Sequence, residues 1–174
     1  MTEPLVRVLD SRDASDFQRL RLRGLQEFPA AFSSSYEEEA HLTDETIGTR
    51  LDDQEVGVVL GAFIGGTLVG VTGIARDRHR KLAHRALMWG VYVAPEGRQH
   101  GVGRALGRAA LEYAKDKLAA RQVILGVGAT NEPAITLYKR LGFESFGIEP
   151  AYLFVDGEYR DEMHMIRFLL EDAR

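Results

Sequence analysis

The chain has 174 residues, of which 45% are hydrophobic and 28% are charged, the usual composition of a globular protein with a sizeable core. Its net charge of −4 gives no electrostatic case for a nucleic-acid partner, and no apolar run approaches the roughly 20 residues that a membrane span needs. The sequence has no cysteine, and its first residues lack the basic and apolar regions of a signal peptide. We therefore expect a cytoplasmic protein without disulfides or thiolate metal sites.

Hydrophobic periodicity and turn residues divide the chain into strands and helices. Strands are predicted at Leu5–Leu9, Val56–Ile64, Thr67–Ala75, Leu87–Val93, Gln122–Val127, Gly142–Ile148 and Tyr159–Leu169. Helices are predicted between Asp10 and Pro29, after Thr43, after Gly101 and over Asn131–Leu141, and a short acidic turn or helix is predicted from Tyr36. Gly65 and Gly66 are typical of a two-residue hairpin. Because no linker or repeat interrupts this order, we expect one α/β domain over residues 1–174 with a mixed sheet.

The most informative stretch is Leu87–Leu106. Its first seven residues carry no charge, which predicts a strand buried on both faces. Pro95 and Gly97 end this strand. The apolar residues that follow have helical spacing at Val102, Leu106, Ala109, Ala110 and Tyr113. The stretch therefore predicts a strand, a glycine-bearing turn and a helix.

The turn between this strand and helix has the composition of an anion site. Free backbone N–H groups at a helix N-terminus bind phosphates, and Gly101 and Gly103 carry no side chain that would block the approach. Arg98 and Arg104 add positive charge.

The glycine spacing also permits a dinucleotide-binding interpretation. That interpretation needs an acidic residue about 20 positions further on, near the end of the next strand. The next predicted strand, Val123–Val127, carries none, and none follows it before Glu132. The seven residues between Val93 and Gly101 also exceed the tight first turn of that fold. Both observations argue against it.

Two motifs together identify a family. The hexapeptide Arg98–Gly103 fits the pattern Arg/Gln-x-x-Gly-x-Gly/Ala, and Asn131 stands 30 residues after Gly101. The segment Asn131–Phe143 fits a second pattern, Asn…Ala…Leu-Tyr…Gly-Phe. With both motifs the chain resembles the GNAT superfamily of N-acetyltransferases, most strongly from Leu87 to Phe146. The resemblance implies a mostly antiparallel sheet of about seven strands flanked by helices, with a splayed central strand pair, and acetyl-CoA as the cosubstrate.

The resemblance also implies a cofactor site. The turn would bind pyrophosphate, the opened central strand would hold pantetheine, and Asn131 would contact the cofactor besides capping its helix. The expected cofactor-binding residues are Val91, Tyr92, Val93, Arg98, Gln99, His100, Gly101, Val102, Gly103, Arg104 and Asn131. Gly90 suits a β-bulge or simple close packing. Tyr138, two helical turns after Asn131, is the expected proton donor to the departing thiolate, with a plain core role as the alternative.

The general base stays open at this stage. Many family members carry Glu or His where this chain has Leu87 and Trp89, and neither of these can titrate. His84 stands at the start of the strand, and we expect it to be too far from the reacting groups to act as the base. A base acting through water, or an amine deprotonated in bulk solvent, remains open.

The acceptor is expected to be a primary amine. Tyr36, Glu37 and Glu38, in an acidic run that continues to Glu39, are the candidate acceptor-binding residues, with a solvated face as the alternative. Small amines, amino acids, polyamines and protein N-termini all remain open. The segments expected to build the acceptor pocket are Pro29–Asp52 and Glu149–Tyr159.

The sequence therefore predicts an acetyl-CoA-dependent N-acetyltransferase in which the amine attacks directly. The chain has no cysteine and no serine in a nucleophile-elbow pattern, so no acyl-enzyme is expected. A non-catalytic acyl-CoA-binding sensor module is the alternative. The five His residues show no metal-ligand spacing, so no metal site is predicted. The expected partners are acetyl-CoA and the amine, without nucleic acid or membrane, and a homodimer is open.

Overall fold

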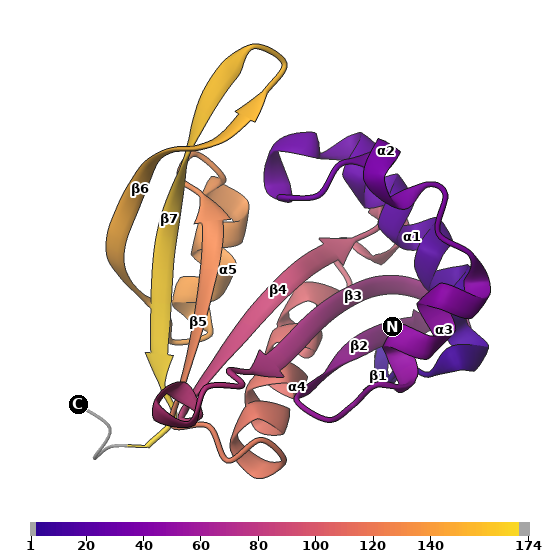
Figure 1. The fold of residues 1–174 in the computed structure, drawn as a ribbon, viewed down its shortest axis with the longest axis horizontal. Helices are drawn as coiled ribbons and strands as arrows, with labels where there is room; N and C mark the ends of the chain where they lie inside the picture. Colours follow the sequence, from indigo (N-terminus) through magenta and orange to yellow (C-terminus); the bar gives the residue numbers. More distant parts are fainter. Residues whose placement is uncertain (1–2, 171–174) are drawn as a thin grey trace.

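The computed structural model describes residues 3–170, which form one mixed sheet of seven strands in the order β1-β2-β3-β4-β5-β7-β6 (Figure 1). The strands are β1 (Leu5–Val8), β2 (Gly57–Ile64), β3 (Thr67–Arg76), β4 (Arg85–Val93), β5 (Gln122–Gly128), β6 (Glu144–Val155) and β7 (Glu158–Phe168). Every neighbouring pair is antiparallel except β4 and β5, which are parallel. The predicted mixed, mostly antiparallel sheet is confirmed.

Helices cover both faces of the sheet, and each face has its own apolar core. The helices are α1 (Ala14–Glu27), α2 (Tyr36–Glu39), α3 (Asp44–Asp52), α4 (Val102–Asp116) and α5 (Glu132–Arg140). Behind the sheet in Figure 1, α4 buries Val102, Leu106 and Ala110 in one cluster. On the opposite face, Leu20 of α1 and Ile47 of α3 belong to a second cluster. Within residues 3–170, no helix is long and apolar enough to cross a membrane.

Strands β4 and β5 diverge, which opens the middle of the sheet. Their pairing extends only from Arg85 opposite Gln122 to Leu87 opposite Ile124, and beyond it the strands separate into a V (Figure 1). The prediction that β4 is buried on both faces is therefore wrong. Leu87 is 46% exposed and Trp89 is 41% exposed, because both side chains point to the same face of the sheet and line a cavity there.

A β-bulge in β4 lies at this opening. In the register with β3, Trp89 faces Gly73 and Tyr92 faces Val71, so two residues of β4, beginning with Gly90, stand opposite a single residue of β3. Gly90 has a φ of +62°, which a residue with a side chain adopts only under strain. The bulge therefore requires glycine here.

Strand β6 runs further than predicted. It was expected to end at Ile148 but continues to Val155, across Pro150. A register shift between Glu149 and Leu153 accommodates the proline. The end of the β6–β7 hairpin extends beyond β5, and β5, β7 and β6 together form one side of the opening (Figure 1).

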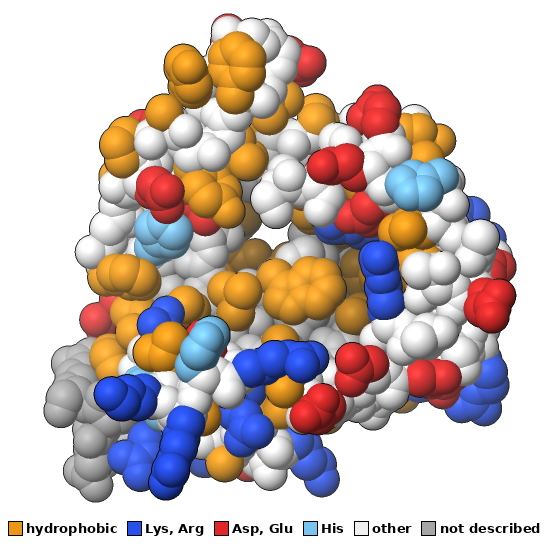
Figure 2. All heavy atoms as spheres, in the orientation of Figure 1, with side chains coloured by type: hydrophobic (Ala, Val, Ile, Leu, Met, Phe, Trp, Pro, Cys, Tyr) orange, Lys and Arg blue, Asp and Glu red, His pale blue; other side chains and the backbone are white. Residues whose placement is uncertain are grey.

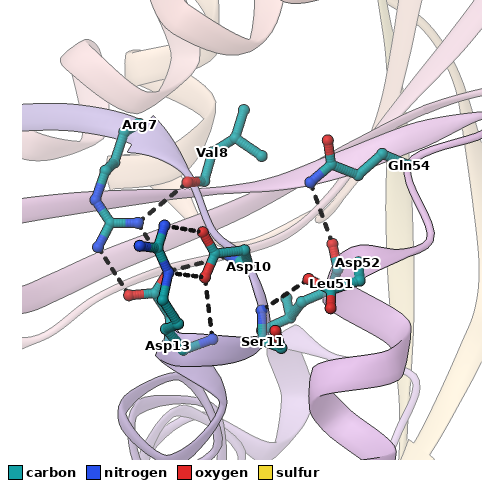
Figure 3. Close-up of polar contacts among 9 residues, drawn as sticks. Arg7, Val8, Asp10, Ser11, Asp13, Leu51, Asp52 and Gln54 are labelled. Carbon is teal, nitrogen blue, oxygen red and sulfur yellow. Dashed lines mark hydrogen bonds and ion pairs between the residues drawn. The ribbon is translucent and has the colours of Figure 1, made fainter.

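Polar contacts fix the other side of the opening near the N-terminus (Figure 3). Arg7 donates two hydrogen bonds of 2.7 Å to Asp13, and Asp10 and Asp13 form a capping box at the start of the turn that leads into α1. The Ser11 N–H donates to Asp52 Oδ1 at 2.9 Å. These contacts join β1, the start of α1 and the end of α3.

Candidate active site

A cavity of about 1070 Å³ lies between β4, the start of α4 and α5. Its lining includes ten residues that the sequence marked for cofactor binding: Val91, Tyr92, Val93, Arg98, Gln99, Gly101, Val102, Gly103, Arg104 and Asn131. The remaining candidate, His100, is exposed and not among the lining residues, and its Nδ1 lies 2.8 Å from the Arg98 carbonyl oxygen. We call this hollow the cofactor cavity.

The α4 end of the cofactor cavity can bind an anion. Gly101 is the N-cap of α4 with a φ of +73°, and the first amide of the helix to bond back to it is that of Ala105, at 2.9 Å. The preceding helical amides of Val102, Gly103 and Arg104 therefore come before the first intrahelical bond, as at any helix N-terminus. The lining also includes Arg98, Arg104 and Arg140, and no Asp or Glu occurs among the described residues that form it. This combination of amides and guanidinium groups favours a phosphate.

Close packing of α4 on α5 gives the cofactor cavity its second wall. A Cβ added at Gly103 would lie 3.1 Å from Leu137, and one added at Gly107 would lie 2.4 Å from Leu141. The two glycines thus let the helices approach, which brings Leu137 to the cavity. At the start of α5, Asn131 Oδ1 accepts a hydrogen bond from the Ala134 amide at 3.3 Å. Asn131 is therefore a helix cap at the edge of the cavity.

The end of β4 is anchored to Glu27, the last residue of α1. The Tyr92 hydroxyl donates to Glu27 Oε2 at 2.8 Å, and burial together with this bond raises the pKa of Tyr92 to about 12. Arg98 lies 3.3 Å from the same Glu27 oxygen, and its Nε donates to the Val93 carbonyl at 3.2 Å. The phenol of Tyr92 is thus used to anchor the strand.

Tyr138 lies inside the core. It is 6% exposed, packs edge-on against Phe143 with ring centroids 5.9 Å apart, and is not among the residues that line the cofactor cavity. Burial raises the pKa of Tyr138 to about 12. The hydroxyl therefore keeps its proton near neutral pH and can act only as a proton donor there.

A second cavity, of about 500 Å³, lies along the first half of β4. Leu87 and Trp89 belong to its floor, while α1 and α3 form one wall and β5 and β7 the other. Figure 2 shows this hollow between two lobes of the molecule, with hydrophobic side chains at its base. The two cavities lie side by side, because Ala31 and Phe32 line both of them. We call this hollow the acceptor cavity.

Glu162 of β7 is a carboxylate in the wall of the acceptor cavity. Its side chain is 18% exposed and lies over Gly126 of β5, because a Cβ added at Gly126 would fall 2.0 Å from Glu162 Oε1. Burial raises the pKa of Glu162, and Glu149 adds to this, while His164 acts in the opposite direction. A carboxylate with a raised pKa in a cavity makes Glu162 a candidate general base.

One residue of the acidic run reaches the acceptor cavity, and it is Glu39. Arg21 donates to it from Nε at 3.0 Å and from Nη2 at 2.8 Å. Burial opposes ionisation, but the bonds and charge of Arg21 hold the pKa of Glu39 below its usual range. The sequence candidates Tyr36, Glu37 and Glu38 are not among the described lining residues, and Glu38 instead caps α2.

Sequence reasoning missed Glu162 and Arg21. Neither stands in a motif, and both are brought to the site by contacts between segments that are distant in the chain. Glu162 reaches it through the register of β7 on β5, in which His164 pairs with Gly126. The available signals were a glycine inside a predicted strand, Gly126, and an arginine on the apolar side of a predicted helix.

Comparisons with known proteins agree with this geometry. The model of the acetyltransferase (GNAT) family matches residues 21–143. An L-amino acid N-acetyltransferase of Escherichia coli is 29% identical over 167 residues, which cover 96% of this chain and 99% of that protein. A GNAT acetyltransferase structure from Streptococcus pneumoniae has a TM-score of 0.86 at 22% identity, over 96% of this chain and all 100% of that one.

A GNAT phosphinothricin acetyltransferase of Sinorhizobium meliloti, solved in complex with acetyl-CoA, has a TM-score of 0.82 at 21% identity. The match covers 99% of this chain and 91% of that one. The resemblance drawn from the two sequence motifs is confirmed, and the chain belongs to the acetyltransferase (GNAT) family.

Proposed function

We propose that this acetyltransferase transfers the acetyl group of acetyl-CoA to a primary amine that attacks directly, within one N-acetyltransferase domain over residues 1–174. The observation that carries the proposal is the position of the bulge in β4. Residues Val91–Val93 line the cofactor cavity, and residues Leu87–Gly90, immediately before them, line the acceptor cavity. A thioester held along the first group would therefore face an amine held by the second.

The residues of the cofactor cavity fit acetyl-CoA. Its pyrophosphate would be held by the amides of Val102–Arg104 and by the surrounding arginines. Pantetheine would pair with the backbone of β4 where β5 has moved away, and backbone N–H groups at the bulge would polarise the thioester carbonyl. Acetyl-CoA itself supplies an activated acyl group, so the protein's main tasks are binding and orientation.

The proton transfers are assigned to two residues. Glu162 is proposed as the general base that takes the proton from the attacking amine, supported by its raised pKa and its place in the acceptor cavity. Tyr138 is proposed as the acid that protonates the departing sulfur. Two observations support this role: the hydroxyl is protonated near neutral pH, and the neighbouring residue Leu137 lines the cofactor cavity. The new C–N bond forms as the C–S bond breaks. Glu162 takes one proton from the amine, Tyr138 gives one proton to the sulfur, and proton exchange with solvent returns both residues to their starting states.

The proposal extends to the acceptor, the location and the assembly of the protein. The Escherichia coli relative acts on L-amino acids by name, which makes amino acids the first acceptors to try. The cysteine-free sequence supports a reducing compartment, and we propose the cytoplasm. A homodimer is the proposed assembly, because a second copy could cover apolar side chains that β6 and β7 expose, among them Phe146, Phe154 and Tyr159.

The experiment combines binding with turnover. Acetyl-CoA should raise the melting temperature, because a ligand selective for the folded state stabilises it. Adding amines should then release free thiol, measured with a thiol-reactive dye. Binding without thiol release for any amine would support the acyl-CoA-binding module instead, while absence of the thermal shift would refute the cofactor site.

A further inference from the structure

The α1 wall of the acceptor cavity holds a guanidinium group with an unused donor. Arg21 is 9% exposed, and its Nε and Nη2 are engaged by Glu39. Its Nη1 is buried and has no hydrogen-bond partner among residues 3–170. An N–H of a cation that is removed from water without an acceptor is unfavourable, so this atom favours an added anion.

This donor lies beside the reacting centre. Nη1 is the nearest heavy atom to the position that a Cβ would take on Gly90, at 3.8 Å. Gly90 is the bulge where the acceptor and cofactor cavities meet. The Phe32 ring lies under the guanidinium, 4.8 Å from its central carbon, and helps to fix its plane. An anion at Arg21 would therefore be positioned against the thioester end of the acceptor cavity.

Charged side chains lie on two walls of the acceptor cavity. The wall formed by α1 and α3 carries Arg21 and Glu39, with Arg50 and Asp53 at the end of α3, and the donor left unpaired there is Arg21 Nη1. Glu162 belongs to the opposite wall, formed by β7. An α-amino acid carries a carboxylate and an amine on one carbon, and this arrangement would hold the carboxylate at Arg21 with the amine toward Glu162. The apolar floor is left for a side chain.

We propose that the acceptor is an α-amino acid with an apolar side chain and that Arg21 recognises its carboxylate. This inference rests on the proposed transferase activity. Guanidinium groups recognise carboxylates in a fixed planar geometry, so Arg21 determines which amines are accepted. The pair with Glu39 then serves to orient the guanidinium.

The test compares three acceptors that share a side chain: L-leucine, L-leucinamide and 3-methylbutylamine. Initial rates of thiol release are measured at saturating acetyl-CoA over a range of pH, and kcat/KM is expressed per concentration of unprotonated amine. Leucine is expected to exceed the other two by about 30-fold or more, the effect of a desolvated charge pair. The amide matches leucine in shape and lacks its negative charge.

Two substitutions separate recognition from a purely structural ion pair. Arg21→Gln should lower kcat/KM for leucine by about 30-fold and lower it much less for leucinamide, so that the preference for leucine is lost. Glu39→Gln removes the partner but keeps the guanidinium, so the preference for leucine should persist or increase. Arg19→Gln, on the exposed side of α1 where Arg19 pairs with Asp16, is the matched control and should change nothing. Melting temperatures report whether each variant is folded.

Two results would overturn the inference while leaving the transferase proposal intact. One is equal use of leucine and 3-methylbutylamine by the unmodified protein. The other is an equal loss for all three acceptors in both Arg21→Gln and Glu39→Gln, which would make the pair structural. Thiol release with none of a wider set of amines, despite a thermal shift with acetyl-CoA, would refute the transferase proposal itself and this inference with it.

Discussion

Gly126→Ala tests whether the position of the Glu162 carboxylate matters for catalysis. The added Cβ would lie 2.0 Å from Glu162 Oε1, whereas ordinary van der Waals contact begins at 3.4 Å. The carboxylate must therefore retreat by about 1.4 Å, which a flexible side chain beside a cavity can do. A misplacement of about 1 Å in a reacting group can cost roughly 10²-fold, so kcat should fall by about that factor.

The same substitution should not weaken the fold. Gly126 lies in a strand without a positive φ, where alanine is favoured over glycine by about 0.5–1 kcal/mol. The melting temperature should therefore stay constant or rise while kcat falls, a combination that general damage to the protein would not produce. The assay is thiol release at saturating acetyl-CoA and acceptor, beside thermal unfolding.

Gly128→Ala is the matched control for this experiment. It lies two residues further along β5, where an added Cβ would meet only Asn131 Cβ, at 3.9 Å. Its kcat should equal that of the unmodified protein. A Gly126→Ala variant with full activity would refute the reasoning, since it would show that catalysis does not depend on where Glu162 now lies.

Three further predictions concern single residues. Gly103→Asp should abolish the acetyl-CoA-induced rise in melting temperature by placing a carboxylate beside the anion-binding amides, whereas Gly103→Ala, which displaces Leu137 by only a few tenths of an ångström, should retain it. Tyr138→Phe should lower kcat by about 10²-fold or somewhat less with acetyl-CoA affinity unchanged, and an unaltered kcat in steady-state kinetics would make Tyr138 a core residue. Glu162→Gln should lower kcat by about 10²–10⁴-fold and remove the acidic limb of the pH–rate profile. Because the pKa of Glu162 is raised in the folded protein, its ionisation destabilises the fold above the unfolded pKa of about 4.3, so Glu162→Gln should unfold at a higher temperature at pH 7 and lose that advantage in acid.

The sequence by itself determined the features that depend on neighbouring residues. A glycine in the left-handed region at Gly101, free amides at the start of α4 and a cap at Asn131 are local properties, so the cofactor turn could be located in advance. The hairpin at Gly65-Gly66 and the bulge at Gly90 were recognisable for the same reason, because each follows from the backbone freedom of glycine. The two motifs at Arg98–Gly103 and Asn131–Phe143, at their fixed separation, were enough to identify the family.

Tertiary structure alone decided what each face of the sheet contacts. The uncharged run in β4 predicts burial on both sides, but hydrophobicity cannot reveal that β5 separates after Leu87 and leaves Trp89 on the floor of a cavity. The positions of Glu162 and Arg21 in the site could not be predicted from the sequence either. The first depends on the register of a strand, and the second depends on a helix that packs beside the opening. A carboxylate gains a raised pKa, and a guanidinium an unpaired donor, only when the packed fold removes water from them.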